Sequence, residues 1–164
     1  MEVARVTLTD AWDRLCAVRS LRLSAKSNDR TSGWNGTGMG TVNVTVTGNS
    51  TITFTERGMW ARDCARQFDF NNIYRWNFNW DAGTIRLEHL RHDPNRPVFL
   101  LDLVPTGDGT FESASPHRCS ADVYTATVKF LDDMVDLHWR VKGPKKDAEI
   151  CCEYAQNMSL HMDQ

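Results

Sequence analysis

Four chemically versatile side chains occur close together near the start of the segment Pro116–Phe130. They are His117, Cys119, Asp122 and Tyr124. If this segment forms one long strand, its side chains alternate between two faces, and Asp122 and Tyr124 share a face with the apolar residues that follow. A carboxylate and a phenol then point toward the interior, and His117 and Cys119 point away from it. The spacing therefore predicts an enclosed polar site near the start of the strand.

Other polar residues end apolar stretches in the same way. Glu56 follows two apolar residues of the same parity, and so do His89 and Arg91. If consecutive strands are joined as hairpins, these side chains and Asp122 gather at one end of the strands. A buried carboxylate needs a hydrogen bond or a counter-charge, and Arg91, His89 and Tyr124 are the available partners.

Large aromatic residues supply the apolar part of this expected site. Trp76, Phe78 and Trp139 lie on inward faces by parity, and such residues fill barrel interiors. Three interpretations stay open: a ligand pocket, an internal polar network that closes the fold, and a catalytic site. The ligand-binding set consists of Glu56, Trp76, Phe78, His89, Arg91, Asp122, Tyr124 and Trp139.

The segments around these residues have the period-two pattern of strands. Val42, Val44 and Val46 alternate with polar residues, and Gly48-Asn49 then gives a hairpin signal. Further alternating segments follow at roughly ten-residue spacing between turns. The sequence therefore predicts an all-β protein, an antiparallel, calycin-like up-and-down barrel of about eight or nine strands.

The expected domain organisation is a single β-barrel domain over 1–164. Trp12, Leu15 and Arg19 have the spacing of a short amphipathic helix over about 10–19, which covers one end or the wall of the barrel. Strands occupy about 20–154, and a C-terminal tail occupies 155–164.

The composition excludes several classes of protein. The chain has 164 residues, a net charge of −2 and 24% charged residues, so it lacks the basic character of a nucleic-acid-binding protein. It has no apolar run long enough for a transmembrane helix and no signal-peptide pattern. We therefore expect a cytoplasmic protein, monomeric or homodimeric, with a small-molecule partner and without nucleic-acid or membrane partners.

The cysteines argue against a disulfide framework and a metal site. Their number is five, which is odd, and none form a Cys-x-x-Cys pair. His117 and Cys119 could supply two metal ligands or a base and nucleophile, but a third ligand at recognisable spacing is missing. An exposed pair is the alternative. We expect no metal and no cofactor.

Two parts of the sequence resemble a known family. His117, Cys119, Asp122 and Tyr124, followed by Trp139–Asp147, are similar to the closing half of an uncharacterised family found in bacteria and fungi. The hairpin over residues 38–56 and Tyr74-Arg75-Trp76 fit the family's earlier pattern. The resemblance implies a calycin-like, lipocalin-like barrel, and it implies no activity.

The favoured function is the binding of an apolar or amphipathic molecule that carries one polar or anionic group. Arg91 would then be the counter-charge, and Asp122 and Tyr124 would orient the ligand. One alternative is a cofactor-free isomerase, cyclase or lyase with Asp122 or His89 as acid or base and Tyr124 as proton donor. The other is a structural or protein-interaction module. The turn with Lys145 and Lys146 is either solvated or attracts an anion.

Overall fold

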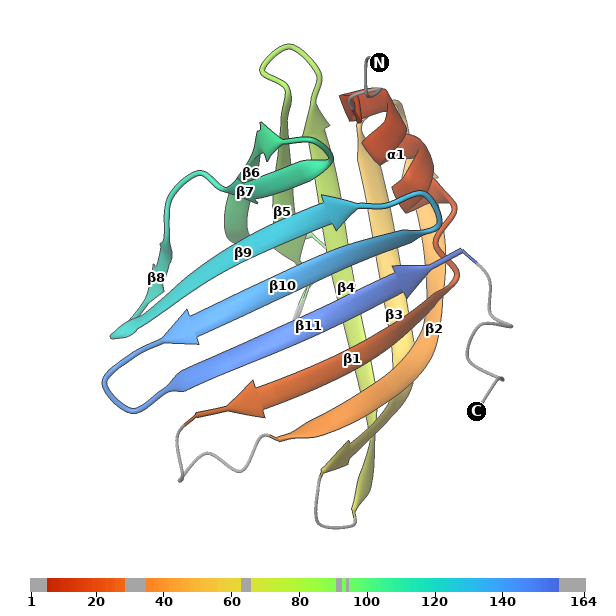
Figure 1. Cartoon of the computed structure of the whole chain (residues 1–164). Coiled ribbons are helices and arrows are strands. Elements are labelled where there is room, and N and C mark those ends of the chain that lie inside the picture. Colours follow the sequence, from red (N-terminus) through yellow and green to blue (C-terminus); the bar gives the residue numbers. More distant parts are fainter. Residues whose placement is uncertain (1–5, 29–34, 63–65, 91–92, 94, 157–164) are drawn as a thin grey trace.

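The chain forms a closed antiparallel β-barrel with one helix (Figure 1). The structure is a computed structural model that describes residues 6–28, 35–62, 66–90, 93 and 95–156. Its elements, in chain order, are α1 (Leu8–Cys16), β1 (Ser20–Ser27), β2 (Gly36–Thr47), β3 (Thr51–Arg62), β4 (Gln67–Asn79), β5 (Thr84–His89), β6 (Val98–Gly107), β7 (Thr110–Ser113), β8 (His117–Cys119), β9 (Asp122–Phe130), β10 (Met134–Lys142) and β11 (Asp147–Ala155).

Most strands pair with their neighbours in the sequence, as in a meander. The ring closes because β11 pairs with β1 and because β7 pairs with β9, whose other edge pairs with β10. Ten of the eleven described strands form this ring, and β8 pairs with β9 alone. The expected class, an all-β antiparallel barrel with a short helix, is confirmed. The expected count of eight or nine strands is wrong.

Of the two additional strands, one comes from the segment that the alternation pattern treats as one strand, and the other is β7. His117–Cys119 and Asp122–Phe130 are instead two strands, joined by a turn in which Ser120 has a φ of 58°. The short strand β7 precedes them, and it pairs with the part of β9 that β8 does not reach. The turn escapes detection because Ser120 occupies the left-handed region where glycine or asparagine is the usual signal.

This hairpin also reverses the expected orientation of His117. His117 is the register partner of Tyr124, and directly opposed residues of an antiparallel pair lie on the same face. The His117 ring lies 5.8 Å from the ring of Phe99 and 6.3 Å from that of Tyr124, between centroids. The expectation that His117 faces away from Tyr124 is therefore wrong, because parity counts only along a continuous strand.

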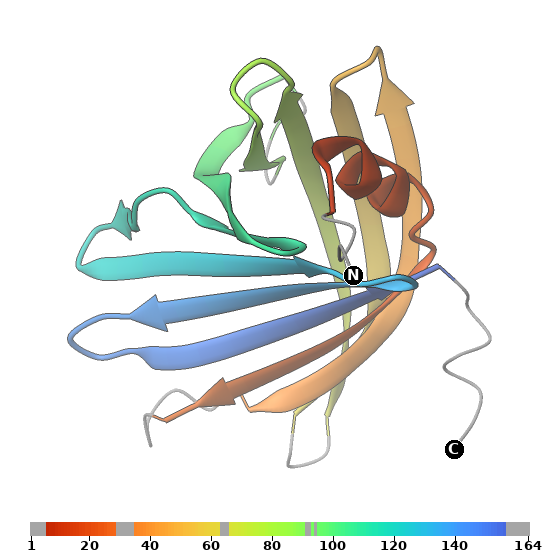
Figure 2. The same ribbon diagram turned by 45° about the horizontal axis from the view of Figure 1, so that its top comes forward.

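The helix α1 covers one end of the barrel. Thr7 is its N-cap and forms a capping box with Asp10, so the helix begins at Leu8 and ends at Cys16, against the expected span of about 10–19. Trp12 packs edge-on against Phe78 at 5.0 Å between ring centroids. Figure 2 shows the helix in front of the barrel end. No helix among the described residues is long and apolar enough to cross a membrane.

Glycines permit a close approach of β2 and β3 on the side away from α1. Gly40 and Gly58 are register partners, and a Cβ atom on Gly58 would meet the backbone of Met39 and the ring of Phe70. A side chain at this position would therefore push the two strands apart. The absence of side chains at these glycines leaves room for the ring of Phe70.

Candidate functional site

On β4 and β11, the inward side chains become less buried with distance from α1. On β4, Trp76 is fully buried, and Tyr74, the next inward residue away from α1, is half-buried. On β11, Tyr154 is fully buried, and Ile150 is half-buried. We call the end away from α1 the mouth, and the fully buried aromatic layer formed by Phe54, Trp76 and Tyr154 the floor.

One acidic residue lies next to this floor, one inward position nearer the mouth than Phe54 on β3. Glu56 follows Ile52 and Phe54 on the inward face of β3, and its side chain is only 2% exposed. Within the described residues, Glu56 and Ser20 are the polar or charged residues that are buried. Among the described residues, the carboxyl group of Glu56 is therefore the charged group that is buried inside the barrel.

Two side chains hydrogen-bond to this carboxyl group. The Tyr154 hydroxyl donates to Glu56 Oε2 over 2.6 Å, and the Asn72 side chain also bonds to Glu56. Asn72 is the register partner of Glu56 on β4, whereas Tyr154 reaches it across the barrel from β11. Cys152, the next inward residue of β11, is also buried near Tyr154 and Glu56.

Burial dominates the electrostatics of this cluster. It raises the pKa of the Glu56 carboxyl from 4.5 to about 7, because the two hydrogen bonds stabilise the ionised form less than desolvation destabilises it. Burial and the nearby Glu56 also raise the pKa of the Tyr154 hydroxyl and of the Cys152 thiol. Tyr154 and Cys152 therefore stay protonated near neutrality, whereas the pKa of Glu56 lies close to neutrality.

Aromatic rings surround the carboxyl group. The Phe54 ring packs against Tyr154 at 5.2 Å and against Trp76 at 5.5 Å, between centroids. Toward the mouth, Tyr74 stacks edge-on against His89 at 4.9 Å. Within the described part of the chain, the buried indole N–H of Trp76 has no hydrogen-bond partner. The floor thus combines an acceptor, an unpaired donor and apolar surface.

The structure brings together some of the residues predicted from the sequence. Trp76, Phe78 and Trp139 belong to the buried core, and Phe78 lies under α1 rather than near the mouth. Glu56 lies next to the floor, and His89 lies beside Tyr74. Arg91 lies outside the described residues, so the structure does not place it.

Asp122 and Tyr124 lie at the mouth, far from Glu56 along the strands. Asp122 Oδ2 forms an ion pair with Lys146 Nζ at 3.2 Å, from the turn between β10 and β11. Its carboxylate also packs against Gly143. Asp122 and Glu56 therefore do not form the single cluster expected from the strand ends. Asp122 lies at the rim of the barrel and Glu56 in its interior, because their strands cross the barrel at different positions along its axis.

Sequence reasoning missed Tyr154, Asn72 and Cys152. Parity along β11 places Cys152 and Tyr154 on one face with Ile150, and this alternation was a usable signal. The contact between Tyr154 and Glu56 joins residues 98 positions apart. It depends on how the strands cross inside the barrel, which alternation alone does not specify.

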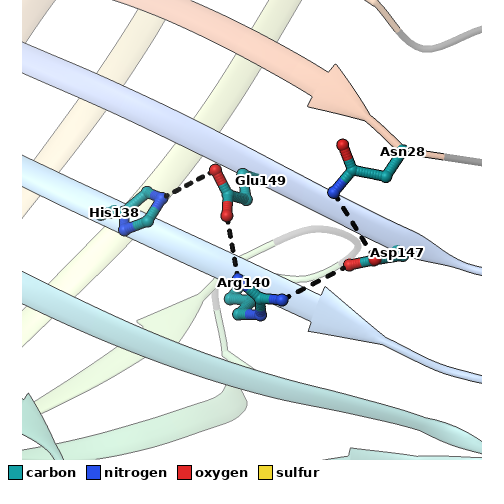
Figure 3. A network of polar contacts seen from close by, with 5 residues as sticks. All are labelled: Asn28, His138, Arg140, Asp147 and Glu149. Carbon is teal, nitrogen blue, oxygen red and sulfur yellow. Dashed lines mark hydrogen bonds and ion pairs between the residues drawn. The ribbon is translucent and has the colours of Figure 1, made fainter.

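A second polar cluster lies on the outer wall and has a structural explanation (Figure 3). Arg140 Nη1 donates to Glu149 Oε1 over 2.9 Å, and its Nη2 lies 3.8 Å from Asp147 Oδ1. His138 Nε2 lies 3.8 Å from Glu149 Oε2. These partly exposed pairs link neighbouring strands β10 and β11. Among the described residues, no group of three or more potential metal ligands gathers at one point.

A groove of about 560 Å³ lies on the surface beside α1. Val6, Asp10, Arg14 and residues 130–133 line it. The Arg14 Nη1 atom donates to the Phe130 carbonyl over 2.9 Å, and Arg14 also pairs with Asp132 at 3.6 Å. The arginine therefore fastens the helix to the turn after β9, and its hydrogen-bonding capacity is directed at the protein itself.

One of two similar solved structures, EF1p2_mFAP2b, supports the barrel fold. The solved structure of EF1p2_mFAP2b bound to DFHBI has a TM-score of 0.50 and 8% identity, covering 92% of this chain and 100% of that chain. The solved structure of mFAP1, a redesigned β-barrel bound to DFHBI, has a TM-score of 0.42 and 7% identity. The match covers 87% of this chain and 96% of that chain. No curated protein matches in sequence. The model of a family of unknown function, DUF6314, matches residues 20–156.

Proposed function

The chain belongs to the DUF6314 family, and we propose that it is a binding protein that holds a small, largely apolar molecule inside the barrel. The observation that carries this proposal is the gradient of burial along β4 and β11, beside the buried carboxyl group of Glu56. On these two strands, inward residues go from fully buried at the floor to half-buried at the mouth, whereas on β10 Val141 is buried at the mouth end. Pockets for small molecules have this character, an apolar wall with few polar groups that fix orientation.

Glu56 is the residue that we expect to orient the ligand. Its carboxyl group is the charged group inside the described barrel, and Asn72 and Tyr154 hold it in place. The unpaired indole N–H of Trp76 offers a ligand a second polar contact. Half-buried Tyr74, His89 and Ile150 supply the wall. EF1p2_mFAP2b, which has a similar fold, is described as bound to DFHBI, which agrees with a binding role.

The remaining predicted residues keep a place in this proposal at the mouth. Asp122 and Tyr124 are half-buried there, and we propose that they contact the part of the ligand nearest to solvent. Arg91 as a counter-charge stays a prediction. We also propose that the barrel is calycin-like and that the protein is cytoplasmic, monomeric or homodimeric. The free thiols of Cys16, Cys119, Cys151 and Cys152 support a reducing location.

Native mass spectrometry of protein purified from its own host tests the binding role. We expect an additional mass that denaturation removes. Ile150→Trp fills the interior near the mouth and should reduce the retained mass, whereas Thr45→Trp, on the exposed outer face of β2, should not. The absence of a retained molecule, or equal retention by both variants, would contradict the proposal.

A proton-transfer enzyme is the second candidate, and one observation favours it. Glu56 is enclosed, and its pKa of about 7 suits a general acid or base at neutral pH. Glu56→Gln keeps the volume and removes proton exchange. If the molecules released from the wild type include a product that is absent from the Glu56→Gln protein, the site is catalytic. Identical released molecules would contradict this candidate and leave the binding role intact.

A further inference from the structure

We propose that the interior site selects a cation, an ammonium group carried on an apolar body, with Glu56 as its counter-charge. This inference rests on the proposed binding function and specifies the ligand class. The buried charge inside the described barrel is acidic. A ligand inside the barrel would contact half-buried side chains such as Tyr74 and Ile150, and the carboxyl group of Glu56, which lies one inward position nearer the mouth than Phe54.

Within the part of the chain that the structure describes, the contacts of Glu56 leave its charge uncompensated. Tyr154 and Asn72 are neutral donors, and no ion pair among the described residues includes Glu56. An ionised carboxylate at 2% exposure is costly without a cationic partner. The group therefore either takes up a proton or receives a cation, and a bound ammonium supplies the missing charge.

The groups around Glu56 on the neighbouring strands also suit a cation. Phe54 precedes it on β3, Asn72 faces it from β4, and Tyr154 and Cys152 face it from β11. Tyr154 and Cys152 carry no charge near neutrality, because their pKa values are raised. Aromatic faces attract cations, most strongly where water is excluded. Phe54 and Tyr154 are both within the fully buried layer.

The charges at the mouth do not oppose the preference for a cation. Lys146 Nζ pairs with Asp122 Oδ2 at 3.2 Å, so the charges of this rim pair cancel. An anionic group bound deep in the barrel would lie against the Glu56 carboxyl group, and like charges in a low-dielectric interior repel strongly. The described interior thus favours a cationic ligand over the anionic one that the sequence suggested, whose counter-charge was Arg91.

A series of ligands that differ only in their head group tests the inference. The dissociation constants of octylamine, octanol and octanoate are measured by calorimetry at about pH 7.5, with wild type, Glu56→Gln and Glu112→Gln. Glu112 is exposed on β7 and makes the same chemical change on the outer surface. We expect octylamine to bind wild type at least about tenfold more tightly than octanol, and octanoate to bind most weakly.

The two variants test whether Glu56 causes the preference for octylamine over octanol. Glu56→Gln should abolish the advantage of octylamine over octanol, and Glu112→Gln should retain it. Equal binding of amine and alcohol, tighter binding of octanoate, or an amine preference that survives Glu56→Gln would overturn the cation inference while the binding function stands. Failure of all three compounds to bind would overturn both. Circular dichroism of Glu56→Gln shows that the variant is folded, and proton release on octylamine binding to wild type is a second readout.

Discussion

Replacing Glu56 with glutamine should change how the stability of the barrel depends on pH. Glutamine keeps the size of the side chain, accepts the hydrogen bond of Tyr154 through its amide oxygen, and does not titrate. Glu56 has a pKa of about 7 in the folded protein and 4.5 as an ordinary glutamate. Between these values the folded state holds a proton that the unfolded state has lost.

The sign and size of the effect follow from this difference. A raised carboxyl pKa contributes stability that is complete below about pH 4.5 and is lost as the pH rises to about 7. At about 1.36 kcal/mol per pKa unit, the difference between 4.5 and about 7 gives a loss of about 3 kcal/mol. Above about pH 7 both states are ionised, so this contribution becomes constant.

Urea denaturation of wild type and Glu56→Gln at several pH values from about 4.5 to 8 measures this loss. The free energy of unfolding of the wild type should fall relative to that of the variant by about 3 kcal/mol across the window. Glu112→Gln is the control, and its curve should run parallel to that of the wild type. Parallel curves for wild type and Glu56→Gln would refute the burial of an unpaired carboxyl group.

Three further predictions concern other parts of the barrel. Tyr154→Phe removes the donor to the buried carboxyl group and should cost roughly 1–3 kcal/mol of unfolding free energy; an unchanged urea midpoint would contradict the hydrogen bond. Gly58→Ala should lower the free energy of unfolding by roughly 1–3 kcal/mol, because the added Cβ atom meets backbone atoms. Gly107→Ala, where the added Cβ atom has open space, should change it by less than about 0.5 kcal/mol. Similar melting temperatures for the two variants would be inconsistent with the close approach of β2 and β3. Asp122→Asn should cost less than about 1 kcal/mol, because its partner Lys146 is largely exposed, and an unfolded variant would show that this pair closes the barrel.

Local alternation predicted the elements of the barrel because each strand has one face in the core. The parity of Ile52 and Phe54 extends to Glu56, and this simple count is why an acidic residue at the interior could be expected. The same count failed for His117. It assumes an unbroken strand, and the turn at Ser120 restarts the alternation on a neighbouring strand.

Contacts across the barrel could not be predicted in this way. Asp122 and Glu56 both have inward parity, yet one pairs with Lys146 at the rim and the other bonds to Tyr154 at the floor. Which inward residues meet depends on the tilt and relative register of strands that are not neighbours. The alternation of a strand indicates which face a residue lies on. Its position along the barrel axis depends on how all the strands are arranged in the closed barrel.

The position of a bound molecule tests the central claim most directly. A crystal structure of the protein with octylamine should show the ammonium nitrogen within hydrogen-bond distance of the Glu56 carboxyl group, with the alkyl chain directed past Tyr74 and Ile150 toward the mouth. Density for octylamine in the groove beside Arg14, or an unoccupied barrel at a saturating concentration, would contradict the claim that the interior of the barrel is the binding site.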